Sequence, residues 1–354
     1  MPYGSGLSAQ LGIAAESTVG TAVTVTKFYE LSADGGETLN KEVGWLRAQG
    51  LKAGQGYITT ARMRQSRFGV AGGLSIFHVD RGVAATGGGM GLWWKHALGS
   101  VITTPTQIAA TTAYKQIHTP GFKTGLAFTA QVGRPQTDGT VKAHTFRGCK
   151  IPSWTFSCSQ DELAMFAPTI DGWQESLVTG LATASYPSAA EPFSFMDAST
   201  FTLGGTASTA SGETSISGGS AVTTVVTGFS LTGSTPMAVD RRGFGNQGVK
   251  REQIENAIPT ITGTLTGEYT AQSEFYALYD SGATTALQLD FAKGDAGGSN
   301  PFRLSFILPA VKITNAPVNA SGPDILGQSI EFEAGSDGTN PVIQVKLVST
   351  DQAL

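Results

Sequence analysis

The chain has 354 residues and a net charge of −4; 40% of its residues are hydrophobic and only 14% are charged. Ordinary soluble domains carry about 25% charged residues, so this low fraction, with 46 glycines, favours β-structure with much surface buried between subunits. A secreted β-protein can share this composition. The acidic balance argues against a dedicated nucleic-acid-binding protein, which normally has a basic footprint. The length corresponds to about two domains.

The first half predicts strands around one short helix. Residues 1–26 are small and weakly patterned and predict an extended N-terminal arm, while 33–57 predict a long loop of the kind that usually binds something. Residues 58–80 predict a long strand or a bent pair of strands. A helix is expected near 91–98, because its apolar residues recur at helical spacing and a glycine follows.

The second half predicts the same succession of elements. Residues 171–192 are expected to be a linker, and the Ser/Thr/Gly-rich stretch 204–221 an exposed loop or hairpin tip. A second long loop is expected at 234–256 and a second helix near 272–280. Residues 328–351 predict a final hairpin with a Gly/Asn turn.

One pattern occurs twice. GVAGGLSIFHVD is followed by GLWWKHALGS, and PTITGTLTGEYT is followed by SEFYALYDSG; each copy precedes a long strand that passes a proline, FRGCKIPSWTFSCS and FRLSFILPAVKITN. We therefore expect a mainly β chain of two tandem β-sandwich or barrel modules, 1–180 and 181–354, each with one short α-helix. Such repetition indicates ring or tube assembly more than catalysis.

The motifs of catalysis and cofactor binding lack their structural context. GFGNQG at 243–248 formally matches a dinucleotide fingerprint, but neither an apolar strand nor a helical pattern flanks it. The four histidines have no metal-ligand spacing, and no G-x-S-x-G elbow is present. Glu331 and Glu333 share a strand face, which is more often solvated than catalytic. We expect no enzyme activity, no catalytic residue, no metal and no cofactor.

Both cysteines are expected to be free thiols. Cys149 and Cys158 lie on one predicted strand, too far apart for a disulfide, which fits folding in a reducing cytoplasm. The chain opens without the pattern of a signal peptide, and no apolar run approaches the roughly 20 residues of a membrane-spanning helix.

Aromatic and basic residues in the long loops are candidates for contacts between subunits. Trp93, Trp94 and Phe275 are expected in the core, where they seat the helices on the sheets. Trp45 differs because it lies in a loop rich in glycine and charge. The cluster ARMRQSR is either solvated or paired across an interface; contact with nucleic acid is the least favoured alternative, because no aromatic stacking platform is interleaved. The interface candidates are Trp45, Arg47, Leu51, Arg62, Arg64, Arg241, Arg242 and Phe244.

An ordered series of segments resembles the major tail tube proteins of long-tailed, siphovirus-like bacteriophages, nearly from end to end. The segments are LGIAAESTVGTAVTVTKFYEL, LRAQGLKAG, GGLSIFHVD with WWKHALGS, GCKIPSWTFSCS, YPSAAEPFSFMDAS, REQIENAIPTITGTLTGEYT and GPDILGQSIEFEA. The resemblance implies a structural subunit of stacked rings, whose inner strands join into a barrel through which DNA leaves the capsid without specific binding.

The doubled length departs from relatives with one tube domain and hexameric rings. The resemblance to forms with a duplicated tube domain implies homotrimeric rings that imitate six subunits, with hexameric rings as the alternative. It also implies partners, namely the tape measure, tail terminator and distal tail proteins, and a place in the virion tail after assembly in the host bacterial cytoplasm.

Two other classes remain open on sequence. One is another phage structural protein, such as a tail spike, fibre or decoration protein. The other is a secreted β-sandwich carbohydrate-binding protein, either a lectin or a glycosidase, against which the missing signal peptide argues.

Overall fold

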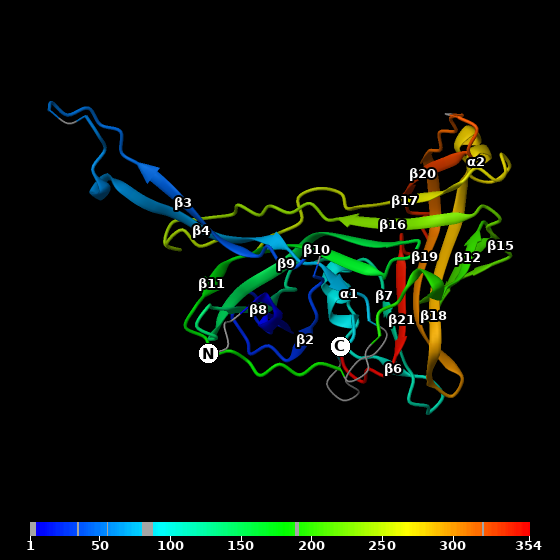
Figure 1. Cartoon of the computed structure of the whole chain (residues 1–354), viewed down its shortest axis with the longest axis horizontal. Helices are drawn as coiled ribbons and strands as arrows, with labels where there is room; N and C mark the ends of the chain where they lie inside the picture. The colour runs from blue at the N-terminus through cyan, green and yellow to red at the C-terminus, as the bar shows by residue number, and fades with distance from the viewer. Residues whose placement is uncertain (1–4, 34, 55, 80–87, 188–190, 321) are drawn as a thin grey trace.

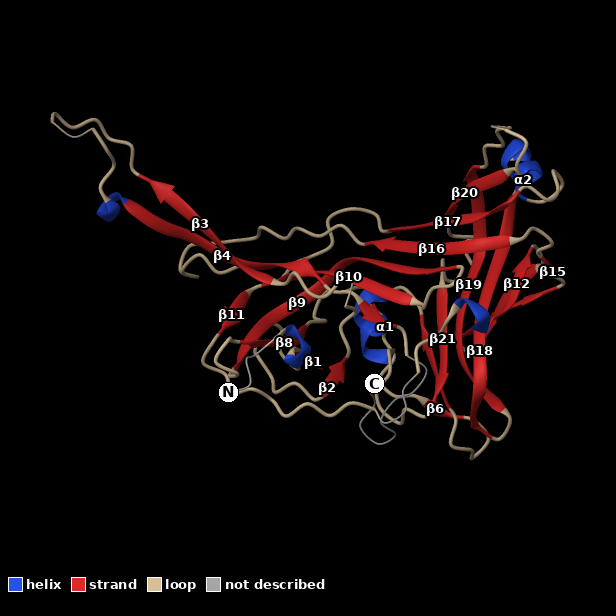
Figure 2. Cartoon of the chain, viewed as in Figure 1, coloured by secondary structure: helices blue, strands red, loops and turns tan. Residues whose placement is uncertain are grey.

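The computed structural model describes residues 5–354 except 34, 55, 80–87, 188–190 and 321. In the described residues, nineteen strands join through antiparallel pairings into one continuous sheet system, and two further strands form a separate hairpin (Figures 1 and 2). Each half contains one short α-helix, α1 (Gly91–Leu98) and α2 (Phe275–Ser281). The expectation of a mainly β chain is confirmed, as are the places of both helices.

Eleven strands precede residue 180 in the described chain. They are β1 (Gln10–Ala15), β2 (Lys27–Tyr29), β3 (Asn40–Arg47), β4 (Met63–Gly73), β5 (Ile76–Phe77), β6 (Thr106–Gln107), β7 (Tyr114–His118), β8 (Phe128–Pro135), β9 (Val141–Ser159), β10 (Met165–Gly172) and β11 (Gln174–Ser176).

Ten strands follow in the described part of the second half. They are β12 (Ala198–Leu203), β13 (Thr206–Ala210), β14 (Glu213–Ser217), β15 (Ser220–Ala221), β16 (Val226–Ser234), β17 (Thr260–Glu268), β18 (Thr284–Gly297), β19 (Asn300–Asn315), β20 (Gly327–Ala334) and β21 (Gln344–Ser349). β13 and β14 pair as the separate hairpin, which confirms a hairpin within 204–221.

β9 connects the two halves. One edge of this 19-residue strand pairs first with β8 and then, over Ser153–Ser159, with β16 of the second half. Its other edge pairs with β11 and β10. A second junction forms where β7 pairs with β21. Because main-chain hydrogen bonds cross between the halves at two places, the halves share one sheet system.

Helix α1 packs into the core through its tryptophans. Trp93 and Trp94 are fully buried. The Trp94 ring lies 4.8 Å from that of Phe166 and 5.1 Å from that of Trp154, measured between centroids. Edge-to-face and tilted contacts of this kind add to the apolar area that each ring buries. The expected core role of both tryptophans is confirmed.

Both helices end at a glycine in the left-handed conformation. Gly99 has φ 73° and Gly282 has φ 61°. A side chain is strained at such positive φ, so glycine is the natural residue at the end of a helix. Phe275 anchors α2 and is 1% exposed, as expected for a core residue. The second helix lies at the end of the molecule, beyond β17 and β20 (Figure 1).

Four expectations about local structure are wrong. Residues 10–15 are not part of a free arm, because β1 pairs with β2 and β8 and buries Leu11 and Ile13. The expected loop 33–57 contains β3, which pairs with β4. The expected linker begins later than 171, because Asp171 and Gly172 end β10 and β11 follows.

The fourth correction concerns the end of the chain. The expected final hairpin does not form, because β20 and β21 do not pair with each other. β20 pairs with β19 near Val311–Asn315 and with β17, while β21 pairs with β19 over Arg303–Ile307. The two strands therefore occupy successive stretches of the β19 edge, and the apolar face of each is buried by that arrangement.

Replacing Trp94 with alanine should lower the free energy of unfolding by about 3–5 kcal/mol, since a large cavity forms where four aromatic rings meet. Urea unfolding of the monomeric chain, followed by circular dichroism, measures this loss. Trp45→Ala is the matched control: its side chain is 55% exposed, so it should change the stability by less than about 0.5 kcal/mol. Equal losses in the two variants would contradict the assignment of Trp94 to the core.

Acid should destabilise the fold well above the range in which most carboxylates titrate. Burial lowers the pKa of His78, His96 and His118 to about 3 each. The unfolded chain, with histidine pKa values of about 6.5, binds more protons than the folded chain between those values, so the free energy of unfolding falls as the pH drops below about 6.5.

Urea midpoints at pH 7, 6 and 5 measure this dependence. The loss should approach about 2 kcal/mol per histidine at pH 5. The raised pKa of Asp351, which is caused by burial, acts in the opposite sense. A His118→Gln variant should show a shallower dependence on pH, and a slope unchanged in this variant would show that His118 does not contribute.

Candidate assembly surfaces

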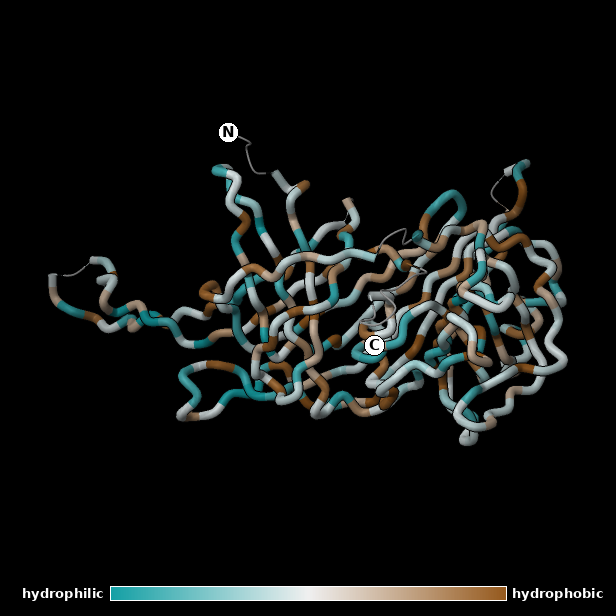
Figure 3. The backbone as a smooth tube through the Cα atoms, turned by 90° about the horizontal axis from the view of Figure 1, so that it is seen from below, coloured by the Kyte–Doolittle hydropathy of each residue, from teal (hydrophilic) through white to brown (hydrophobic). Residues whose placement is uncertain are grey.

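A long arm projects from the body of the molecule. We call residues 40–67 the β3–β4 arm; it comprises β3, the tip 48–62 and the first five residues of β4. Figures 1 and 3 show the arm standing clear of the body in two perpendicular views. In the described residues β3 pairs only with β4, so its outer edge carries unpaired main-chain groups. Such an edge is a template for pairing with another chain.

The side chains of the arm suit a protein partner. Trp45 is 55% exposed and Tyr57 is 92% exposed, and Leu46, Leu51 and Ile58 are exposed as well. Contiguous exposed apolar residues mark interaction sites. The arm also carries six basic residues and one acidic residue, Glu42, which gives it a charge of +5; the rest of the chain therefore carries −9.

A second projecting segment, residues 235–259, lies between β16 and β17 and is the counterpart that the sequence led us to expect at 234–256. It runs from the second half across β9 and β10 of the first half (Figure 1). Its backbone also meets β4, since the Phe68 amide donates to the Gly248 carbonyl at 2.9 Å. This segment is thus seated on the first half of its own chain.

A buried ion pair anchors the segment to β10. Lys250 Nζ lies 2.5 Å from Asp171 Oδ1, and the two side chains are 3% and 9% exposed. Gln253 Nε2 donates to the other carboxylate oxygen at 2.7 Å and to the Asp171 carbonyl at 3.1 Å. Burial raises the pKa of Asp171, while Lys250 and Gln253 oppose that rise.

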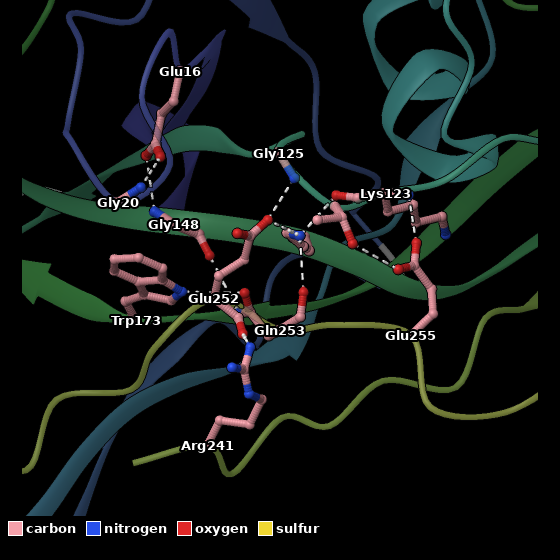
Figure 4. Close-up of polar contacts among 12 residues, drawn as sticks. Glu16, Gly20, Lys123, Gly125, Gly148, Trp173, Arg241, Glu252, Gln253 and Glu255 are labelled. Carbon is pink, nitrogen blue, oxygen red and sulfur yellow. Dashed lines mark hydrogen bonds and ion pairs between the residues drawn. The ribbon is translucent and has the colours of Figure 1, made fainter. Parts of the chain in front are cut away.

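One more ion pair and several hydrogen bonds to carboxylates follow along the segment (Figure 4). Lys150 Nζ donates to Glu252 Oε1 at 2.8 Å, and to the carbonyls of Lys123 and Gln253 at 2.7 and 2.9 Å. Glu255 accepts the Lys123 amide, and Glu252 also accepts the Gly125 amide at 2.5 Å. Each buried charge therefore has an opposite charge or a hydrogen-bond partner, as burial requires.

The lysines of this cluster are perturbed in the direction that burial predicts. Burial lowers the pKa of Lys123 to about 7, although Glu255 opposes the change. The pKa of Lys150 is lowered for the same reason. For Glu252, burial acts to raise the pKa, but Lys150 and the Gly125 amide together lower it. The cluster is a structural clamp that holds the segment on the first half of the chain.

The residues proposed from sequence separate into two groups. Trp45, Arg47, Leu51, Arg62 and Arg64 all lie on the β3–β4 arm. The other three, which belong to the 235–259 segment, are Arg241, Arg242 and Phe244. The structure does not bring the two groups together into one site.

Two of the segment's candidates already bind within the chain. Arg241 Nη1 donates to the Glu252 carbonyl at 2.6 Å, and Arg242 Nη2 to the Phe68 carbonyl at 3.1 Å. Phe244 is fully exposed. The Arg62 guanidinium on the arm donates to the nearby Gly50 carbonyl at 3.3 Å.

The clamp residues were not expected from sequence. Lys123, Lys150, Asp171 and Gln253 lie far apart in the chain, and none of them belongs to a motif. One signal was present, because the stretch KREQIENA at 250–257 is more charged than most of this chain. Its partners could not be identified without the fold.

In the described residues, no group of three or more His, Cys, Asp or Glu side chains could hold a metal ion. An apolar cavity of about 380 Å³ lies between β12, β16 and β18, with Phe201, Phe229 and Leu289 in its wall. It lacks the convergent polar groups of an active site. No helix in the part of the chain that the structure describes is long and apolar enough to cross a membrane.

Removing Lys250 should cost about 3–5 kcal/mol of unfolding free energy, because Lys250→Met leaves the Asp171 carboxylate buried without its cation. Adding Asp171→Asn should restore part of the loss. The exposed pair Arg67–Asp240, at 3.6 Å, supplies the control, since Arg67→Met should cost less than about 1 kcal/mol. Urea unfolding and hydrogen exchange of residues 248–256 measure both effects. Additive losses in the double variant would contradict a coupled pair.

The comparisons with known proteins agree with these features. The sequence matches the family described as "Phage tail tube protein" over residues 6–334, a range that includes both helices, the arm and the clamp. No curated protein matches the chain. Since the match covers nearly the whole sequence, this chain belongs to the phage tail tube protein family and is a structural component of a phage tail.

Proposed function

We propose that this chain is the repeating subunit of a tail tube, in which rings stack around a channel for DNA. The observation that carries the proposal is the pairing of β9 with β16. There, an edge of a strand of the first half pairs directly with a strand of the second half, so the sheet continues from one half into the other. The same kind of junction between chains would close a ring of strands, which removes exposed strand edges.

We further propose that three chains form each ring, with a six-fold appearance. In each half a strand follows the projecting segment, and then come a short helix that ends at a glycine, a pair of strands and a further strand. These elements are β4, α1, β8–β9 and β10 in the first half, and β17, α2, β18–β19 and β20 in the second. This supports two tube modules, 1–180 and 181–354, in one chain. Two modules per chain need half as many chains to close a ring.

The charge of the chain fits a passage for DNA. An overall charge of −4, and −9 outside the arm, repels phosphates and lets DNA pass without being held. In this role the chain is not an enzyme and needs no cofactor. Its partners are other copies of itself and the tape measure, tail terminator and distal tail proteins, with assembly in the host cytoplasm and a final place in the virion tail.

Electron microscopy of the concentrated full-length chain tests the proposal. Stacked rings are expected, and averages viewed down the tube axis should contain three chains per ring with six similar modules. Six chains per ring would contradict the trimer, and a chain that stays monomeric with its tail partners present would contradict the tube itself.

A further inference from the structure

The point at which the chain leaves the β3–β4 arm and β4 has a definite place in the sheet. In the first half, Trp154 lies two residues after Pro152 on β9. Trp154 pairs with Pro168 on β10. The Pro168 carbonyl accepts a hydrogen bond from the amide of Leu74 at 3.1 Å, and Leu74 directly follows β4.

The point at which the chain leaves the 235–259 segment has the same place in the second half. Val311 lies two residues after Pro309 on β19. Val311 pairs with Ala334 on β20, and Ala334 pairs with Ile261 on β17. Leu74 and Ile261 therefore occupy matching positions, and so do Pro168 and Ala334.

This correspondence extends into the two projecting segments. Lys250 lies eleven residues before Ile261. Eleven residues before Leu74 is Met63, which is flanked by Arg62 and Arg64. Two cations of the arm, Arg62 and Arg64, thus flank the position that corresponds to the anchoring lysine.

The correspondence also extends to the anchoring acid. Asp171, which binds Lys250 at 2.5 Å, lies three residues after Pro168, and Asp337 lies three residues after Ala334. Asp337 follows β20, which lies at the opposite end of the molecule from the arm (Figure 1). The arm of a chain cannot reach this acid in its own chain, so only two different copies can bring the arm and the acid together.

The surroundings of Asp337 complement the arm. Ile258, three residues before Ile261, is 85% exposed, and Glu333 is an exposed residue of β20. We call Ile258, Glu333 and Asp337 the second-half seat. It offers apolar and acidic groups to an arm that carries exposed apolar residues and a charge of +5.

We propose that the β3–β4 arm of one copy lies on the second-half seat of another copy, with Arg62 and Arg64 facing Glu333 and Asp337. The arm would thus bind the second half of another copy in the way that the 235–259 segment binds the first half of its own chain. Because arm and seat are different surfaces, the contact is head-to-tail, and such a contact forms a ring when the rotation between successive copies closes. The proposal rests on the proposed tube function and names the surfaces that join its subunits.

Charge reversal with rescue tests this contact. Asp337 already orders a turn, since it accepts the amides of Thr339 and Asn340 at 2.9 and 2.7 Å, so Glu333 is the better site to reverse. Arg62→Glu with Arg64→Glu, and separately Glu333→Arg, should each reduce the assembled fraction at least tenfold in sedimentation. All three changes in one chain should restore assembly, which a merely structural effect would not do.

The control is Lys142→Glu, which reverses an exposed charge on β9 outside both surfaces and should leave assembly unchanged. Circular dichroism and melting temperature verify that each variant folds. Assembly of the arm variant at the wild-type level, or failure of the combined variant to recover, would overturn the inference. Loss of duplex DNA binding, without loss of assembly, would instead make the arm a nucleic-acid contact and would also overturn it.

A crosslinking experiment locates the seat directly. Cys149 and Cys158 are buried, so a Leu51→Cys variant carries one accessible thiol, to which a photoreactive maleimide is attached. Mixed light and heavy copies should give crosslinks between chains from the arm to second-half peptides. A Val178→Cys variant, equally exposed outside the arm, is the control. If the wild type forms no rings, the tube function fails; if rings form with crosslinks elsewhere, only this inference fails.

Discussion

The long strand β9 is the constraint on which the rest of the structure depends. Its main-chain groups are bonded along both edges, and the partner on one edge changes from β8 to β16 as the strand passes from the first half to the second. The same strand supplies Trp154 and Phe156 to the core, where they meet the rings of α1 and β19. A break in β9 would therefore remove one of the two junctions between the halves and open the core.

The clamp on the 235–259 segment depends on that frame. Lys150 and Asp171 come from β9 and β10, and the sheet holds them near enough for the segment to satisfy both charges. Desolvating these charges is costly, so the clamp adds less to stability than its number of contacts suggests. Its value lies in register: a buried charge accepts one partner in one position, and this fixes where the segment crosses the first half.

The two projecting segments differ in how far the rest of their own chain covers them. The 235–259 segment is seated on its own chain and keeps most of its polar groups paired. The β3–β4 arm keeps its hairpin but leaves Trp45, Tyr57 and its basic groups toward solvent. Exposed aromatic side chains on a hairpin are unfavourable in a monomer. The hairpin therefore fits a subunit in which a neighbouring chain covers it.

Local patterns determined much of this protein by themselves. Alternation gave the strands around Gly72 and Leu265, helical spacing and glycine ends placed α1 and α2, and size and apolarity put Trp93 and Trp94 in the core. These features depend on near neighbours in the chain, which a sequence displays directly. Register and partners were decided only by the tertiary structure: β20 and β21 looked like a hairpin but lie in series on β19, and Asp171 looked like linker but ends β10. A strand edge can accept any strand of suitable shape, and a lysine any buried acid. Only the assembled sheet brings Lys250 to Asp171 and leaves the arm without a cover.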